Sequence, residues 1–572
     1  MKLRDQFRRL YQLPQAHQSE VCLPELANAM HCSERNMRLL LSKMAQQHWL
    51  DWQAGRGRGN KSKLQFLLTP DDLMSDHLAQ LLARGELELA FASLDEQQKL
   101  QLSKRLPEYL GIADQACRRL RMPLFRSPVS LDPLYAHARL ESYLVRQIFS
   151  RLTYFDGNQK RLLPALAHHW ESQDQGQCWH FWLRPNLSFH DGSRLDTEDV
   201  KHTLLRLRSQ PAIYFNLYQH LQKIETGAGG RISFYLDRPD YLWPHLLATA
   251  NASIVPRRRR SDFARLPIGS GAFRLIRNNP YQLTLQAFKD YYRERPLLDE
   301  IDLWVLRASA DDTELDLHYG YSCQQNDDKR HLVRAEAGSS HLICNSQRPQ
   351  FRQTAQRLAL ADWLAPAFLF DANHPSRSHA HGLLSCWQHR QVISAEQSPA
   401  APFKRGTRLR MVSGQNAEMR ELAQKVKNRL EQAGAIVDWQ ALDFSELSAR
   451  LWLEHTDIVV TREVMHDDVE FGCFEWFLCD SVFRRWMPAA GVTHIDHMLD
   501  QIRASANTAT RNSLLEQIAR KLVTEAWLIP LSHEIQHVSV APHVAGARVT
   551  PFGFAALRDL WLRDNAPSLS TD

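Results

Sequence analysis

The chain has 572 residues, of which 44% are hydrophobic and 23% are charged. This composition excludes a disordered or fibrous protein, and the length is sufficient for about three or four domains with cores of their own. Residues 1–70 hold eleven of the 70 cations but only five of the 64 acids, which leaves 59 of each sign in the remaining 502 residues. The net charge of +6 therefore lies at the front of the chain. We expect a basic surface there that binds an acidic partner.

The sequence shows no pattern typical of export or of insertion into a membrane. Its first nine residues begin an amphipathic helix without an apolar core, and no uninterrupted apolar run reaches about 18 residues. The nine cysteines are an odd number and include no Cys-x-x-Cys pair. These features predict reduced thiols, a cytoplasmic location and no membrane partner.

Residues 21–68 predict a helix, a tight turn, a second helix and a β-hairpin. Ser33 is a good N-cap for the second helix, and residues 49–53 and 64–67 alternate like paired strands. Apolar residues recur at helical spacing in both helices. They are Leu23, Leu26, Ala27 and Met30 in the first helix, and Met37, Leu40, Leu41 and Met44 in the second. The pattern is that of a winged helix-turn-helix over residues 1–70.

A winged helix of this charge suggests double-stranded DNA as a partner, because a helix fits the major groove and a basic hairpin can reach phosphates. The front of the second helix is where base edges are contacted, and the candidates there are Ser33, Arg35, Asn36 and Arg38. The candidates for phosphate contacts are Lys43, Arg56, Arg58, Lys61 and Lys63. Two alternatives remain open: a solvated basic face on an ordinary helical domain, and a winged helix that binds protein.

Residues 71–117 predict a helical linker with an acidic and glutamine-rich surface. A coiled coil is an alternative there, but Gly85, Pro107 and Gly111 interrupt its period, which favours a compact linker. From residue 118 strands and helices alternate. A strand at 409–412, a helix at 417–433 and a strand at 436–439 form a β-α-β unit, as a second α/β lobe requires.

Several ordered motifs in this second part carry a family resemblance. They are Trp179-His180-Phe181-Trp182-Leu183-Arg184-Pro185, Gly269-Ser270-Gly271-Ala272-Phe273 and Phe288-Lys289-Asp290-Tyr291-Tyr292. The order resembles the family 5 solute-binding proteins that serve peptide and nickel ABC importers. The resemblance implies a periplasmic-binding-protein-like domain of type II at 118–572. Its lobes would be 118–306 with 530–572, and 307–529, with a ligand between them.

The N-terminal motifs extend the resemblance. Glu25-Leu26-Ala27, Cys32-Ser33-Glu34-Arg35 and Gly57-Arg58-Gly59, placed before a solute-binding module, resemble the SgrR family of bacterial transcriptional regulators, which respond to sugar-phosphate stress. The best-known member activates a small-RNA gene. The resemblance implies a multidomain α/β regulator, with a winged helix, a helical linker and a domain whose cleft senses a sugar phosphate, a sugar or a peptide.

No motif indicates an enzyme, a cofactor or a metal site. Asn60 stands where a phosphate-binding P-loop needs glycine, and Gly269-Ser270-Gly271 lacks the third glycine of a dinucleotide site. The histidine clusters and the pair Cys473 and Cys479 lack metal-ligand spacing. The run at residues 257–260, four arginines, is either a solvated loop offset by Asp262 or an extension of a DNA-facing surface.

Four residues are candidates for the effector site, because small polar solutes need charged groups and an aromatic wall. They are Arg126, Tyr154, Trp387 and Asp480. The leading hypothesis is a DNA-binding regulator that senses a metabolite. The alternatives are a cytoplasmic solute-binding module that acts through a protein partner, and an enzyme without a recognisable motif. The sequence leaves the number of subunits open.

Overall fold

The structure is a computed structural model that describes residues 3–18, 20–55, 61–70, 72–73, 78, 80–81, 87–92, 94, 118–305, 316–320, 329–394, 396, 399–479, 481–550 and 552–563. The chain forms two compact units, Met1–Arg105 and Leu106–Asp572. No helix in the described part of the chain is both long and apolar enough to cross a bilayer.

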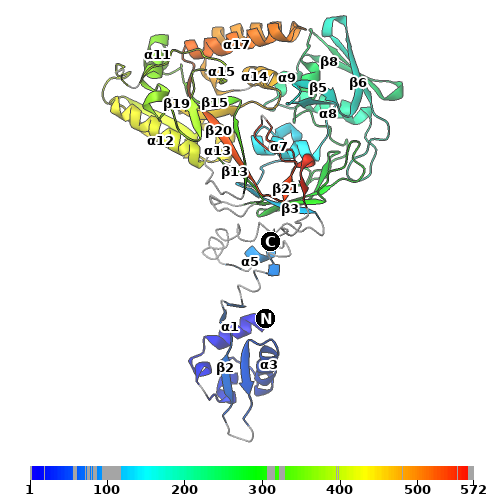
Figure 1. Ribbon diagram of the computed structural model, residues 1–572, viewed down its shortest axis with the longest axis vertical. Coiled ribbons are helices and arrows are strands. Elements are labelled where there is room, and N and C mark those ends of the chain that lie inside the picture. Colours follow the sequence, from blue (N-terminus) through cyan, green and yellow to red (C-terminus); the bar gives the residue numbers. More distant parts are fainter. Residues whose placement is uncertain are drawn as a thin grey trace, which may run out of the picture. The chain divides into compact units, whose positions relative to one another are not determined.

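The N-terminal unit is a winged helix. Its elements are α1 (Leu3–Tyr11), η1 (Pro14–His17), α2 (Leu23–Ala29), α3 (Glu34–Gln46), β1 (Leu50–Gln53) and β2 (Lys63–Phe66) (Figure 1). β1 and β2 pair antiparallel, with Leu50 opposite Phe66, and Val21 forms a bridge to Ser62 beside them. The predicted order of helix, helix and hairpin is confirmed.

Local sequence explains these elements. The Ser33 hydroxyl accepts the N–H of Asn36 at 3.3 Å and so caps α3, as predicted. Met37 and Leu41 on α3 are fully buried, and the ring of Phe7 meets Trp49 and Phe66 edge-on with centroids 5.6 Å away. One face of α3 is thereby held in the core, which leaves its other face to solvent. Of the predicted linker the structure describes one helix, α5 (Leu87–Ala92).

The larger unit begins with three groups of strands. Its elements up to residue 305 include β3 (Arg119–Leu124), α7 (Arg139–Ile148), β4 (Thr153–Asp156), β5 (Arg161–Pro164), β6 (Ala167–Gln173), β7 (Cys178–Leu183), α8 (Thr197–Ser209), α9 (Phe215–Tyr218), β8 (Leu221–Thr226), β9 (Arg231–Leu236), α10 (Trp243–Leu246), β10 (Phe273–Asn278), β11 (Gln282–Ala287) and β12 (Glu300–Val305). The strands pair as β10-β11-β12-β3, as β6-β7-β9-β8 and as the hairpin β4-β5.

The rest of the unit carries a longer sheet. Its elements include β13 (Leu317–Gly320), β14 (Arg330–Ala335), β15 (Gly338–Cys344), α11 (Thr354–Trp363), β16 (Arg377–His379), β17 (Arg408–Gly414), α12 (Ala417–Gln432), β18 (Ile436–Leu442), α13 (Phe444–Ala449), β19 (Ile458–Val464), α14 (Val469–Leu478), α15 (Val482–Trp486), α16 (Ala489–Ala504), α17 (Thr508–Thr524), β20 (Leu528–Val540), β21 (Val544–Ala545) and β22 (Trp561–Leu562). Its strands follow the order β13-β20-β15-β19-β17-β18. β17 and β18 are parallel neighbours joined through α12, which confirms the predicted β-α-β unit.

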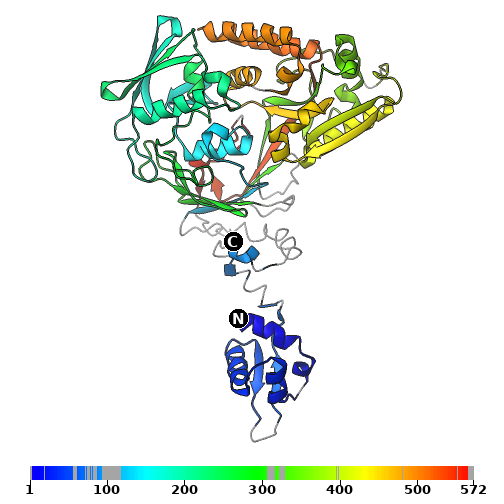
Figure 2. The same ribbon diagram turned by 180° about the vertical axis from the view of Figure 1, so that it is seen from behind.

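β20 joins two lobes. Its first half pairs with β15, and its second half pairs with β13 and β14. Val538 and Val540 of the second half belong to the same core as β3 and α7, whereas Ile529 and Leu531 of the first half belong to the core around α12. In both views β20 lies between cyan α7 and yellow α12 (Figures 1 and 2). The space between the lobes therefore has walls from segments far apart in sequence.

Candidate functional site

The exposed face of α3 is the first candidate site. Arg35, Asn36 and Arg38 are exposed, and Met37, between them in sequence, is fully buried. No ion pair joins Arg35, Arg38 or Lys43 to another residue that the structure describes. These cations are therefore available to an external anion, and Arg35 lies in the capped first turn.

The hairpin places further cations on the same unit. Lys61 lies 3.9 Å from Glu20, and both side chains are more than half exposed, so this contact is weak. Lys63 is exposed on β2. Arg56 and Arg58 lie outside the described residues. The described cations fit the geometry in which a helix enters the major groove and a wing contacts phosphates.

Leu39 also lies on the exposed face of α3, and sequence reasoning missed it. It is 52% exposed, next to the buried Leu40 and Leu41. A signal was present, because residue 39 falls off the helical spacing of the buried residues 37, 40, 41 and 44. An apolar side chain here can contact the methyl group of thymine.

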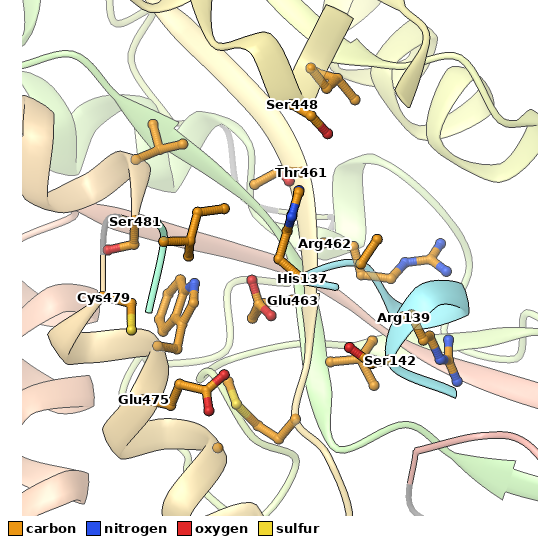
Figure 3. A pocket seen from close by; sticks show the side chains of 18 of the residues that line it. His137, Arg139, Ser142, Ser448, Thr461, Arg462, Glu463, Glu475, Cys479 and Ser481 are labelled. Carbon is orange, nitrogen blue, oxygen red and sulfur yellow. The ribbon is translucent and has the colours of Figure 1, made fainter. Parts of the chain in front are cut away.

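A cavity of 490 Å³ between the two lobes is the second candidate site. Its volume lies in the range of about 300–1,000 Å³ that small-molecule sites occupy. Its polar lining includes His137, Arg139 and Ser142 at the start of α7, Thr461 and Glu463 on β19, and Glu475, Cys479 and Ser481 in and beyond α14 (Figure 3). The predicted interlobe cleft is thus present in the fold.

Two carboxyl groups face each other across this cavity. Glu463 comes from β19 and Glu475 from α14 (Figure 3). Burial raises the pKa of Glu463 to about 7. Burial also raises the pKa of Glu475, to about 8, and the Glu463 carboxylate adds to that rise. At neutral pH a neutral Glu475 can both donate and accept a hydrogen bond, as hydroxyl groups of a ligand require.

His466 does not neutralise Glu475. Its Nε2 lies 3.9 Å from Glu475 Oε2, but burial lowers the pKa of His466 to about 4. At neutral pH the imidazole is therefore uncharged. We interpret the contact as one between neutral groups, not as an ion pair.

The arginines of the cavity have partners. Arg139 Nη1 lies 2.6 Å from Glu336 Oε1, and Arg146 Nη1 lies 3.1 Å from Asp467 Oδ2. Arg462 lies 3.7 Å from Glu534, on β20. The apolar wall includes Ile213, Leu447, Trp452, Trp476 and Val482. The site combines a protonated Glu475, a partly protonated Glu463, arginines paired with acids and aromatic surface, which suits a polar ligand that carries hydroxyl groups.

The four predicted effector residues do not come together. Arg126 makes a bidentate contact of 2.6 and 2.7 Å with Glu141 and lies over Phe444 at 4.1 Å, outside the lining of the cavity. Tyr154 lines a smaller cavity of 100 Å³. Trp387 is half-buried against the core, away from the lining of the larger cavity. Asp480 lies outside the described residues, although its neighbours Cys479 and Ser481 line the cavity.

Sequence reasoning missed Glu463 and Glu475. A signal was available for both. Glu475 stands in the largely apolar helix VEFGCFEWFL, and Glu463 is the last residue but one of the strand IVVTREV, whose first three residues are apolar and buried. An acid in such a segment is rarely buried unless it has a partner or a functional role. Nothing in the sequence, however, indicated that the two segments face the same cavity.

The remaining candidates from the sequence are the possible metal ligands and the arginine run at 257–260. No group of histidines, cysteines or acids in the described ranges could hold a metal ion. Arg257 of the arginine run pairs with Asp199 at 3.0 Å, and Arg260 pairs with Asp262 at 3.2 Å. The run at 257–260 is exposed, and acids offset part of its charge.

Comparison with known families divides the chain as the fold does. Residues 2–116 match the family described as "Sugar transport-related sRNA regulator N-term" (SgrR_N). Residues 161–361 match "Bacterial extracellular solute-binding proteins, family 5 Middle". The winged unit and the lobed unit thus have separate, known relatives.

Full-length relatives carry both parts. HTH-type transcriptional regulator SgrR of Yersinia pseudotuberculosis is 28% identical and covers 98% of each chain, and SgrR of Salmonella typhimurium is 28% identical and covers 99% of each chain. Protein YbaE of Escherichia coli is equally similar, 28% identical over 98% of each chain. The domain arrangement of the chain is therefore that of these relatives from end to end.

Solved structures share the fold of the larger unit. The binding protein AgaA from A. tumefaciens R10, solved with agropinic acid, superposes with a TM-score of 0.66 at 18% identity, covering 78% of this chain and 99% of its own. The oligopeptide-binding protein AppA of Bacillus subtilis, solved with a nonapeptide, gives 0.66 at 17% with the same coverage. These likenesses confirm the predicted solute-binding fold.

Proposed function

Since this chain belongs to the SgrR family of transcriptional regulators, we propose that it binds double-stranded DNA through α3 and the hairpin, and responds to a small metabolite held between the lobes. The observation that carries the proposal is the exposed pair Arg35 and Arg38. Both lie on a helix whose other face is buried, and neither makes an ion pair with a described residue. The proposal places the protein in the cytoplasm, where DNA is found.

At the DNA, the front of α3 would contact base edges. Arginine suits guanine and Asn36 suits adenine, whereas Lys43, Lys61 and Lys63 would contact phosphates. Ser33 already caps the helix through its hydroxyl oxygen. Its hydroxyl proton remains available to a phosphate, so we propose a positioning role for Ser33 as well as a contact.

In the larger unit, the effector would lie against Glu463 and Glu475. A protonated Glu475 and a partly protonated Glu463, in a cavity that Trp452 and Trp476 also line, suit a ring that carries hydroxyl groups, and we propose a sugar or the sugar part of a sugar phosphate. A ligand that contacts both lobes favours the closed arrangement. A coupling of about 1–3 kcal/mol would change DNA affinity about 5- to 150-fold.

The experiment has two arms on the full-length protein. In the first arm, DNA duplexes selected from a random pool are titrated with the protein at salt concentrations between 50 and 200 mM. We expect the affinity for DNA to fall steeply as the salt concentration rises. A thermal-shift screen of hexoses, hexose phosphates and dipeptides then tests the cavity, since a binder at about 100 times its Kd adds about 2.7 kcal/mol. Glu475→Ala should abolish the shift.

Two results would contradict the proposal. An affinity for duplexes that does not depend on salt, together with a stable protein partner in pulldown, would favour a solute-binding module that acts through protein. A shift given by dipeptides alone would replace the sugar with a peptide.

A further inference from the structure

A second, smaller cavity adjoins the one between the lobes. It has a volume of 100 Å³, and both cavities are lined by Arg146 and Phe552. Tyr154, Tyr291 and Tyr292 supply phenol groups to its wall. The volume is sufficient for several water molecules or for one tetrahedral oxyanion.

The guanidinium of Arg151 lies in this wall without a partner. Its Nε and Nη1 atoms are buried, and neither makes a hydrogen bond in the described part of the chain. No described acid forms an ion pair with it either. Arg146 Nε is buried too, and no acceptor for it lies among the residues that the structure describes. Two neighbouring arginines of the cavity lining thus carry buried donors without an acceptor among the described residues.

Several other buried arginines of the larger unit have acid partners, although Arg357 instead donates to backbone carbonyls such as that of Phe351 at 2.9 Å. Arg511 Nε lies 2.5 Å from Glu470, Arg206 makes a bidentate contact with Asp132, and Arg377 lies 3.6 Å from Glu534. Burying an unpaired charge is costly, so folded proteins normally supply a counterion. Arg151 has neither kind of partner among the described residues, and burial lowers its pKa to about 10.

The surroundings of Arg151 are positive. Arg293 and Arg558 lie over the ring of Tyr154 at 5.6 and 5.9 Å. The acid that lines the cavity, Asp467, is engaged by Arg146 at 3.1 Å and accepts the N–H of Phe552 at 3.0 Å. Outside the lining, Asp559 lies 3.4 Å from Arg558. The cations of the wall outnumber its acids, and phenol groups add further donors.

We propose that this cavity binds a small oxyanion, with the guanidinium of Arg151 and the hydroxyl of Tyr154 as donors. A phosphate group matches both the volume and the donors. The anion is either free phosphate or the phosphate of an effector whose other part occupies the interlobe cavity. The second case rests on the function proposed above.

The test uses inorganic phosphate and the full-length protein. Calorimetry and thermal shift at constant ionic strength, with chloride as the reference anion, should show binding of phosphate by the parent chain. Arg151→Met should weaken it at least 10-fold, and Tyr154→Phe about 3-fold. Arg408→Met is the matched control, because Arg408 is exposed on β17 and lines neither cavity, and it should change nothing.

Stability separates binding from a structural role. In phosphate-free buffer Arg151→Met should unfold at the same temperature as the parent or higher, because it removes an unpaired buried charge. A parent chain that does not bind 10 mM phosphate would overturn the proposal. So would an Arg151→Met variant that unfolds at a lower temperature yet binds phosphate as the parent does.

Comparing inorganic phosphate with a hexose phosphate distinguishes the two sources. If the ester binds at least 10-fold more tightly and Arg151→Met abolishes both, the anion belongs to the effector. Equal affinities support a site for free phosphate. The affinity for DNA duplexes, measured in the same samples, distinguishes the oxyanion site from the proposed control of DNA binding by an effector. If phosphate binds without changing the affinity for DNA, the result supports the oxyanion site and counts against control by an effector.

Discussion

Two groups of cations that look alike in sequence differ in their partners. On α3, Arg35 and Arg38 are exposed, and no described acid pairs with them. In the larger unit, Arg257 pairs with Asp196 and Asp199, and Arg260 pairs with Asp262. The density of charge along a chain therefore does not identify a binding surface. Exposed cations that no described acid engages are the better candidates for contacts with a partner's phosphates.

The largest effect should come from the buried charges around Glu534 of β20. Glu534 of β20 lies 3.6 Å from Arg377 and 3.7 Å from Arg462, and accepts the Ser340 hydroxyl at 2.9 Å. Glu534→Ala removes a buried carboxylate from both arginines and leaves, among the acids that the structure describes, Glu421 beside Arg377 and Glu336 beside Arg462. It should lower the free energy of unfolding by about 3–5 kcal/mol, measured by denaturant titration. Glu431→Ala, which removes an exposed pair with Lys427, should cost less than about 0.5 kcal/mol. Equal losses of stability in the two variants would contradict the view that Glu534 neutralises buried arginines.

The pH dependence of stability should identify the cavity acids. The folded chain holds a proton on Glu475 up to a pKa of about 8, whereas the unfolded chain releases it near 4.5. The free energy of unfolding therefore falls as pH rises between these values. Glu475→Gln should match the parent at pH 4 and exceed it at pH 9 by a difference on the order of 3 kcal/mol. Parallel pH profiles of parent and variant would show that Glu475 ionises normally.

Substitutions on α3 should separate specificity from affinity. Arg35→Ala should weaken binding to a selected duplex by about 1–3 kcal/mol, with a smaller effect on random duplexes, if Arg35 contacts a base. Competition titrations against both duplexes measure this. Equal losses on the two would assign Arg35 to a phosphate.

The smallest effect compares the two cation groups directly. Lys61→Ala should reduce the slope of log affinity against log salt by about one, because one phosphate contact is lost. Arg257→Ala is the matched control and should leave the slope unchanged, since acids of its own unit already engage it. A reduced slope for Arg257→Ala would place the run at 257–260 on the DNA.

Much of the fold could be predicted because its signals are local. Ser33 caps α3 through a residue three positions away, and β1 and β2 pair across one hairpin. The order of motifs in the second part indicated the solute-binding fold. The effector residues could not be predicted in the same way: Arg126 and Trp387 suit a ligand site by type, but the fold uses one for an ion pair with Glu141 and the other for packing.

The sequence by itself determined the two-part architecture and the basic winged helix. Contacts between residues close in the chain produce periodicity, caps and turns, and the amino-acid sequence shows these directly. Only the tertiary structure decided which charges remain available. Glu463 and Glu475 share a cavity, and Arg151 lies in the same lining as Tyr154 with no counterion in the described part of the chain, because separate strands and helices meet there. These contacts between residues far apart in the sequence depend on how the lobes pack, and no local sequence pattern predicts them.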